Sequence, residues 1–333
     1  MVTTATLADV ALKAGVSTAT VSRFLSGTSA VAPATKAKVQ QAMDELNYHP
    51  NRMARALRTQ QTKQIGVVLP GFENQFFFEL LLHIERAARE RGFGVLIAGD
   101  HSLPECLHNL QSGGAVDGII LASSSWPKAT PPKTTIPMVC IDRPLPGAHA
   151  TFVSVDNVQG ARTVAEHLLT RGATTFGLLT GPLSIPAAQE RRAGFYQAVH
   201  GATVTEQEGD FTSQAGIDFV DALDPAQLPH AIFACNDLMA AGVVSRLKEN
   251  HLRTMVAGFD GITSATTLYP RITTLVQPQE KLARMAVDKL VQEIEETGTN
   301  RKRNKQQIYL PGTLRVGDTT AGHNKNNNKE HKQ

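Results

Sequence analysis

The chain has 333 residues, of which 41% are hydrophobic and 19% charged, and it contains 26 glycines and 17 prolines. This composition is typical of a globular protein, so it excludes fibrous, collagen-like and wholly disordered chains, and the length predicts two or three domains. No stretch approaches ~18 consecutive apolar residues, so no transmembrane helix is predicted. Residues 1–6 lead into charged sequence without an apolar signal core, and we expect a cytoplasmic protein with no membrane partner.

Charge is divided unevenly along the chain. Residues 1–64 carry eight Lys or Arg and three Asp or Glu, a net charge of +5, whereas the remainder carries 25 basic and 27 acidic residues, a net charge of −2. A basic N-terminal part on a slightly acidic body is typical of a nucleic-acid-binding protein, although solvated helical faces are often as basic.

The three cysteines, Cys106, Cys140 and Cys235, lie far apart and form no CxxC or Cys/His cluster. We therefore expect buried, reduced thiols and no disulfide framework, metal or cofactor.

Residues 1–47 predict three short helices. Thr6 and Ser17 favour helix starts, Gly15 ends the first helix, and Pro33 stands where a third helix can begin. About 50 residues enclose too small a core for much stability, so we expect this all-α head to be ordered partly by what it binds.

Beyond Gln64, apolar runs alternate with helical patterns. Strands are predicted at 65–69, 94–98, 118–122, 138–141, 176–179, 231–234 and 255–259, and helices at 76–91, 160–171, 187–199, 237–249 and 279–296. Continuous apolar strands separated by helices indicate parallel sheets covered on both faces. These units are too many for one sheet, so the predicted fold class is α/β: a small helix-turn-helix head followed by two doubly wound parallel-sheet lobes with a cleft between them.

Residues 10–23 have the layout of a helix-turn-helix, in which a glycine turn joins a short helix to a second helix that opens with small hydroxyl residues. The start of the second helix at Ser17 offers backbone N–H groups to a phosphate, and small side chains such as Ala19 can approach base edges. An ordinary helical hairpin shares this bare pattern.

Further segments along the chain make it resemble the LacI family of bacterial transcriptional repressors. They occur in the family's order from residue 5 to residue 320, which is more specific than any one motif. From the head to the start of the body they are Thr6–Ala11, Gly15–Ser17, Thr20–Arg23, Leu46–Tyr48, Pro50–Arg52 and Ile65–Val67. In the body they are Val116–Ile120, Glu166–Leu168, Arg191–Gly194, Asn236–Asp237, Gly258–Asp260 and Leu275–Pro278.

This resemblance implies a homodimer whose two heads read double-stranded, palindromic operator DNA. The linker, about Asn51–Arg58, would become helical on the operator, with Leu57 wedged into the minor groove, where an inserted aliphatic side chain kinks the duplex. Alternatively, Leu57 is a core leucine at the junction between the domains. The candidate DNA-binding residues are Leu7, Ser17, Thr18, Ala19, Thr20, Ser22, Arg23, Asn51, Ala54 and Leu57.

The resemblance also divides the chain. We expect the DNA-binding head at 1–49, a hinge helix or linker at 50–63, the effector-binding and dimerisation body at 64–320, and a disordered tail at 321–333, which is rich in Asn and Lys.

The body resembles periplasmic sugar-binding proteins. Sugars need bidentate polar partners for adjacent hydroxyls and an apolar surface for their C–H face, and open α/β sheets bind ligands where strands end. The candidate effector-binding residues are Phe72, Asn74, Phe76, Phe77, Asp142, Arg143, Arg191, Asn236, Asp260 and Gln277. Most of them look like the pattern of ribose-binding members of this fold, so ribose is the favoured small-carbohydrate effector. Sucrose, fructose, a sugar phosphate and a nucleobase remain alternatives.

Other classes of function are less well supported. No phosphate-binding loop, nucleophile elbow, HExxH or dinucleotide fingerprint occurs, so we expect no enzyme and no catalytic residues, although Asp142 and Asp260 could in principle form an acid–base pair. A sugar receptor without DNA function is the second alternative, and the basic head argues against it.

Overall fold

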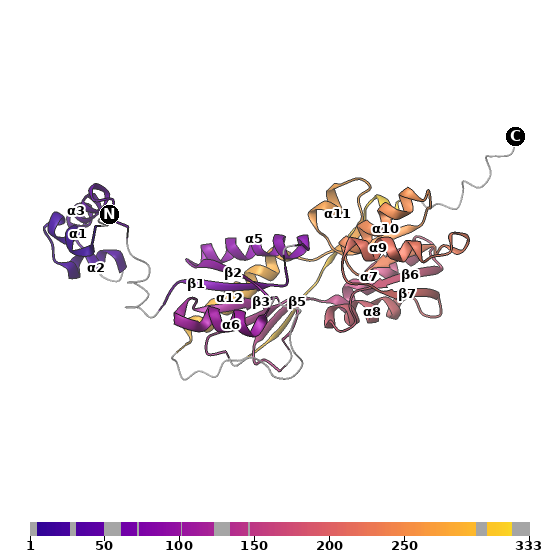
Figure 1. Ribbon diagram of the computed structural model, residues 1–333, viewed down its shortest axis with the longest axis horizontal. Helices are drawn as coiled ribbons and strands as arrows, with labels where there is room; N and C mark the ends of the chain where they lie inside the picture. The colour runs from indigo at the N-terminus through magenta and orange to yellow at the C-terminus, as the bar shows by residue number, and fades with distance from the viewer. Residues whose placement is uncertain are drawn as a thin grey trace. The chain divides into compact units, whose positions relative to one another are not determined.

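The computed structural model describes residues 5–26, 31–49, 61–71, 73–100, 102–122, 134–145, 147–297 and 305–321, and the elements are labelled in Figure 1. The chain divides into two compact units, Met1–Thr62 and Lys63–Gln333, which we call the head and the body. Residues 50–60 of the expected linker (50–63) and residues 322–333 of the expected tail (321–333) lie outside the described residues.

The head contains α1 (Leu7–Ala14), α2 (Thr18–Ser26) and α3 (Pro33–Glu45). Thr6 and Asp9 form a reciprocal capping box at the start of α1, and Gly15 ends this helix in the left-handed conformation that glycine adopts at little cost. Val10, Val21 and Val39 contribute one fully buried side chain from each helix to a small shared core. The predicted three-helix head is therefore confirmed.

The described residues of the body form two six-stranded sheets. The first has the order β11-β5-β4-β3-β1-β2 and the second β12-β10-β9-β8-β6-β7. All strand pairs are parallel except that of β10 with β12. The bounds in the first sheet are β1 Gln64–Leu69, β2 Gly94–Gly99, β3 Gly118–Leu121, β4 Met138–Ile141, β5 Thr151–Val155 and β11 Gln307–Leu310. Those in the second sheet are β6 Thr175–Thr180, β7 Thr203–Glu208, β8 Ala231–Ala234, β9 Met255–Asp260, β10 Thr273–Val276 and β12 Thr313–Arg315.

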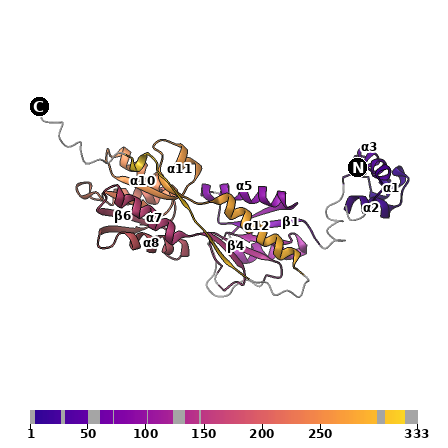
Figure 2. The same cartoon turned by 180° about the vertical axis from the view of Figure 1, so that it is seen from behind.

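Helices cover both faces of each sheet, as expected for parallel strands. In the first lobe α5 and α12 pack together on one face of the sheet and α6 lies on the other (Figures 1 and 2). In the second lobe α7 packs with α8, and α9 packs with α10. The first-lobe bounds are α5 Gln75–Glu90, α6 Leu103–Gln111 and α12 Gln279–Glu295. The second-lobe bounds are α7 Asn157–Thr170, α8 Pro186–Ala198, α9 Ser213–Asp221, α10 Asp237–Glu249 and α11 Thr263–Thr267. Short 3-10 turns occur at Ser112–Gly114, Pro225–Gln227 and Asp318–Thr320.

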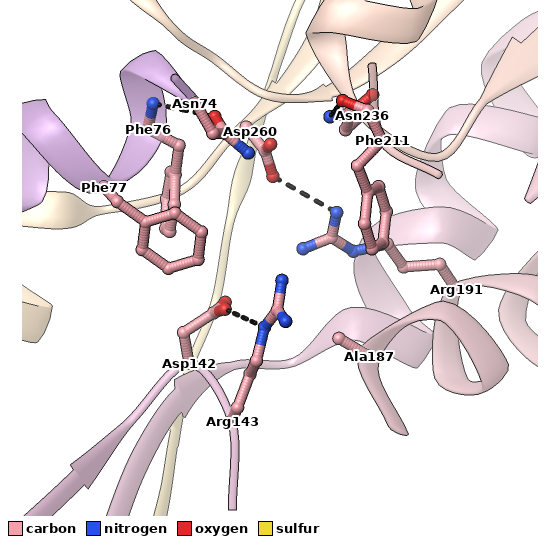
Figure 3. Close-up of a pocket in the computed structure, with 10 residues that line it drawn as sticks. All are labelled: Asn74, Phe76, Phe77, Asp142, Arg143, Ala187, Arg191, Phe211, Asn236 and Asp260. Atoms are coloured by element: carbon pink, nitrogen blue, oxygen red, sulfur yellow. Dashed lines mark hydrogen bonds and ion pairs between the residues drawn. The ribbon is translucent and has the colours of Figure 1, made fainter. Parts of the chain in front are cut away.

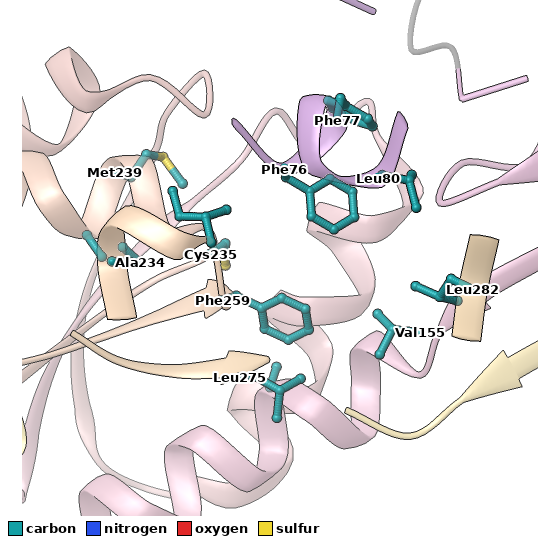
Figure 4. Close-up of a cluster of buried hydrophobic side chains, with 14 of the residues drawn as sticks. Phe76, Phe77, Leu80, Val155, Ala234, Cys235, Met239, Phe259, Leu275 and Leu282 are labelled. Carbon is teal, nitrogen blue, oxygen red and sulfur yellow. The ribbon is translucent and has the colours of Figure 1, made fainter. Parts of the chain in front are cut away.

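Three chain crossovers join the lobes. The chain passes from β5 into α7, returns from β10 into α12, and passes again from β11 into β12. One apolar cluster includes residues of both lobes near these crossovers, among them Val155, Phe259, Leu275 and Leu282 (Figure 4). The crossovers are therefore packed into the core.

The predicted two-lobed α/β class is confirmed, and the differences lie at particular elements. Helix α7 begins at Asn157, three residues before the predicted start at Gly160, because Asp156 accepts the Gln159 N–H and caps it. Gly160 lies inside the helix, where an added Cβ would stand 2.3 Å from the Leu275 side chain. Strands β5, β7, β10, β11 and β12 were not predicted, because polar residues interrupt each of them and leave no continuous apolar run of the kind by which the other strands were predicted.

Candidate functional site

In the head, the local sequence turns one face of α2 outward. The Ser17 hydroxyl accepts the Thr20 N–H at 3.2 Å and lies 2.9 Å from the Thr20 hydroxyl, which caps the helix start. Val21 is fully buried and anchors the opposite face against α1 and α3. Thr18 and Ala19 consequently lie exposed on the first turn.

The remaining predicted DNA-binding residues are placed as follows. Ser22 is half-buried beside exposed Arg23, whose Nε donates to the Ala19 carbonyl at 3.3 Å. Leu7 packs partly against the head core. Asn51, Ala54 and Leu57 lie outside the described residues.

In the body, ten residues from both lobes line one pocket (Figure 3). From the first lobe, Asn74 accepts the Phe76 N–H at 3.0 Å and caps α5, which turns the adjacent Phe76 and Phe77 toward the pocket. Asp142 and Arg143 follow β4 directly, where the strand ends. The lining residues are Asn74, Phe76, Phe77, Asp142, Arg143, Ala187, Arg191, Phe211, Asn236 and Asp260.

The second lobe contributes the other charged pair. Arg191 comes from α8 and Asp260 from the end of β9, and both are buried. Arg191 Nη1 lies 3.2 Å from Asp260 Oδ1. Gln277 donates Nε2 to the same Asp260 oxygen at 2.8 Å, so it lies behind Asp260 and is not part of the pocket lining. Asn236 caps α10.

The charged pair of the first lobe, Asp142 and Arg143, makes fewer hydrogen bonds than the pair formed by Arg191 and Asp260. Arg143 Nε lies 3.4 Å from Asp142 Oδ2, and its guanidinium stands over the Phe77 and Phe211 rings, 5.5 and 5.9 Å from their centroids. Asp142 Oδ1 is buried without a hydrogen bond to any of the described residues. Because a buried acceptor without a partner costs free energy, this oxygen is suited to a hydroxyl donor from a ligand.

Three lining residues hold unusual backbone conformations. Asp142, Phe211 and Asp260 have φ of 64°, 69° and 113°. Such positive values in residues other than glycine cost about 1–3 kcal/mol each and persist only where the surroundings hold them. Such a concentration of strained residues around one pocket is typical of a functional site.

Burial also changes the acidity of Asp260. Desolvation raises the pKa of this carboxyl group to about 6, even though the Arg191 charge and the Gln277 hydrogen bond act in the opposite direction. Asp260 is therefore mainly ionised at neutral pH and balances Arg191, so the pocket holds two guanidinium groups and two carboxylates.

The structure brings together eight of the ten predicted effector-binding residues. Phe72 lies outside the described residues, and Gln277 supports Asp260 from behind. Two further lining residues, Phe211 and Ala187, were not predicted from the sequence. Phe211 stands alone in a polar loop before α9, so no periodicity could indicate it, and Ala187 lies in a helix without chemistry of its own.

The described residues contain no cluster of three or more His, Cys, Asp or Glu that could hold a metal ion. Nor is any helix among them both long and apolar enough to cross a membrane.

A helical head and a two-lobed body with a polar pocket between its lobes define a class of DNA-binding, ligand-responsive protein. A model of the bacterial regulatory proteins of the lacI family matches residues 6–51, and a model of the periplasmic binding protein-like domain matches residues 165–320. The HTH-type transcriptional repressor PurR of Edwardsiella ictaluri is 32% identical over 330 residues, which cover 92% of this chain and 94% of PurR.

Solved structures agree. The Lac repressor dimer bound to operator and the anti-inducer ONPF has a TM-score of 0.79, and the transcriptional regulator CelR in complex with cellobiose has 0.69. Each is 28% identical and covers 95% of this chain and 99% of its own. The chain belongs to the lacI family of bacterial regulatory proteins. It is a sequence-specific, DNA-binding transcriptional repressor regulated by a small molecule, and it is not an enzyme.

Proposed function

We propose that the effector is a small neutral sugar bound in the pocket between the lobes, and that ribose is the best candidate. The observation that carries this proposal is the balance of charges. Asp142 and Asp260 match Arg143 and Arg191, so the pocket offers donors and acceptors for vicinal hydroxyls without an excess charge. Aromatic rings from both lobes can cover the C–H face of the sugar.

The pocket is narrow as it stands. Its cavity volume is about 20 Å³, roughly the room that one water molecule needs, so the two lobes must move apart to admit any of these ligands. Among them, a sugar phosphate would add two negative charges that no surplus cation balances.

A nucleobase is the second candidate, and one observation favours it. The Phe77 and Phe211 rings come from opposite lobes and both face the pocket, so a planar base could stack on either (Figure 3). The four charged groups argue against it, because a base has fewer polar edges than a pentose has hydroxyls.

On the DNA side, we propose that the exposed face of α2 reads the major groove, with Thr18, Ala19, Ser22 and Arg23 toward the bases and phosphates. The Lac repressor structure contains a dimer bound to operator. By analogy, this chain would bind a palindromic operator as a dimer, and it would do so in the cytoplasm, where the operator DNA is. Leu57 would then insert into the minor groove as a wedge.

The dimer contact would lie on the first lobe. Phe78 and Leu82 on α5 are 48% and 55% exposed, and the edge strand β2 exposes Leu96 and Ile97. An uncovered apolar edge strand invites association, and a second copy of this chain would cover it.

We expect the sugar to act as an inducer, because a sugar that signals its own availability would relieve repression. Binding would favour one arrangement of the lobes over the other, so operator affinity falls by the difference in sugar affinity between the two states. A corepressor would instead bind more tightly to the state that binds the operator, so operator affinity would rise.

The test is a thermal-shift and calorimetric screen of ribose, fructose, sucrose, ribose 5-phosphate, adenine and hypoxanthine. Ribose should raise the melting temperature, and Arg191→Ala should weaken its binding by about 100-fold or more, since charged hydrogen bonds contribute ~1.5–3 kcal/mol each. Arg192→Ala is the matched control, because the neighbouring Arg192 pairs with Glu206 and does not line the pocket.

Asp142→Asn keeps the shape of the pocket, so this variant replaces Arg191→Ala in the binding test if Arg191→Ala does not fold. A shift with adenine or hypoxanthine and none with any sugar would make the effector a nucleobase. Full ribose binding by both pocket variants would place the effector elsewhere.

A further inference from the structure

Asp237 is a buried carboxylate that does not line the pocket. It is the first residue of α10, immediately after the lining residue Asn236, and it is fully buried. Its Oδ2 accepts the N–H groups of Gly261 and Ile262, at 2.7 and 2.9 Å. These are the two peptide groups that follow Asp260.

The turn that Asp237 holds is strained. Asp260 and Gly261 have φ of 113° and 74°, and an added Cβ at Gly261 would lie 2.6 Å from the Val276 Cα. A positive φ in a residue other than glycine, as at Asp260, persists only if its surroundings hold it, and the two N–H bonds that Asp237 accepts supply such a restraint.

Strand β9 approaches the other carboxylate oxygen of Asp237, Oδ1, just as closely. An added Cβ at Gly258, in β9, would lie 2.3 Å from Asp237 Oδ1, so only glycine lets the strand approach the carboxylate. Burial, reinforced by the nearby Asp260 charge, raises the pKa of Asp237 well above its usual value. An apolar residue would avoid this cost of burial, but it could not accept the two N–H groups.

We propose that Asp237 is a positioning residue that holds Asp260 in the conformation in which it accepts hydroxyl groups of the effector. This inference rests on the proposed function, because it takes Asp260 as a ligand-binding residue. Without the two bonds from Asp237, the turn can relax toward ordinary extended backbone, and Asp260 leaves Arg191 and Gln277. The pocket then loses an acceptor although no lining residue has been changed.

The experiment measures D-ribose binding by calorimetry for the wild type, Asp237→Ala and Asp237→Asn. Asp237→Ala should weaken binding about 10- to 100-fold, by analogy with the loss seen when residues that orient metal-binding side chains are removed. Asp237→Asn should stay within about threefold of the wild type, because its amide oxygen still accepts the N–H groups. Asp221→Ala, which removes a surface carboxylate paired with Arg246 in the same lobe, is the control.

A purely structural role would lower the melting temperature of Asp237→Ala and leave ribose affinity unchanged well below that temperature, which overturns the inference. An equal loss in Asp237→Asn and Asp237→Ala overturns it as well. If Asp237→Ala does not fold, Asp237→Ser replaces it, since serine is tolerated at a helix start and its hydroxyl is too short to reach the turn.

A crystal structure of the same Ala or Ser variant gives a readout that needs no ligand. Asp260 should leave the left-handed region, and its carboxylate should separate from Arg191; an unchanged Asp260 overturns the inference whatever the wild type binds. Failure of the wild type to bind ribose overturns the proposed effector alone, and this structure then decides the role of Asp237.

Discussion

At the scale of single residues, Arg191 shows how a buried side chain is prepared for a ligand. Its Nε donates to Asn157 at 2.8 Å, and its Nη1 donates to the Cys235 carbonyl at 2.6 Å and faces Asp260. Arginine has five N–H groups, so the two on Nη2 remain without a bond to the described part of the chain. The guanidinium is held in place and still has one edge for the pocket (Figure 3).

The pKa of about 6 at Asp260 predicts a pH dependence of effector binding. The ionised carboxylate accepts ligand hydroxyls, whereas the protonated form must donate one bond itself. Binding therefore favours the ionised form, and ribose affinity should fall about tenfold from pH 7 to pH 5. Calorimetry across this range measures it, and near pH 6 binding should release a fraction of a proton. A flat profile would show that Asp260 does not take the ligand in its ionised form.

Arg23 allows the DNA surface to be tested in the same way. Arg23→Ala should weaken operator binding by about tenfold or more and leave ribose binding unchanged, because its side chain lies on the exposed face of α2. Lys13→Ala is the control, since Lys13 is a basic residue of the same head paired with Glu45 at 2.7 Å. Footprints that are the same for Arg23→Ala and the wild type would contradict the assigned recognition helix.

At the scale of elements, α5 joins the pocket to the other lobe. Its first turn faces the pocket, while Glu79 Oε1 accepts the Thr263 N–H at 3.0 Å and Gln75 accepts the Ser264 hydroxyl at 2.5 Å. Thr263 and Ser264 begin α11 in the second lobe. These bonds join the two lobes although none of the four residues lines the pocket, so we expect them to favour the observed, closer arrangement of the lobes.

Glu79→Ala should therefore weaken ribose binding about fivefold to tenfold by raising the population of open lobes. Glu85→Ala is the matched control on the same helix, because Glu85 pairs only locally with Arg89 among the interactions of the described residues. Calorimetry gives the affinity, and small-angle scattering gives the opening of the unliganded protein. An unchanged affinity together with an unchanged radius of gyration would exclude a closing role for these bonds.

Which strands the sequence predicts depends on whether their residues form an unbroken apolar run. Buried strands such as β1 and β4 are mainly apolar, so their runs are visible in the sequence. The edge strand β7 alternates polar residues, and the buried strands β5 and β10 contain threonine or serine, so none of these three was predicted. Within the site, Asp142 and Asn236 follow such runs directly and are predictable, whereas Phe211 depends on a loop conformation with positive φ that leaves no periodic signal.

At the scale of the whole molecule, the apolar face of the first lobe predicts the assembly. Leu82→Glu should convert a dimer into a monomer, since it places a charge in a desolvated contact, and operator affinity should fall with it. Leu169→Glu, at a second-lobe leucine that is 36% exposed, is the control. Sedimentation equilibrium reports the mass, and a Leu82→Glu protein that remains dimeric would move the contact to another face.

We propose that a sugar in the pocket controls the affinity of the head for DNA. Anisotropy titration of an operator fragment selected from genomic DNA, with and without saturating D-ribose, tests this control most directly. We predict that ribose weakens operator binding about 5- to 150-fold, the usual range of allosteric coupling, and that Arg191→Ala binds the operator normally and ignores ribose. Operator binding that is unchanged by ribose in the wild type would contradict the account.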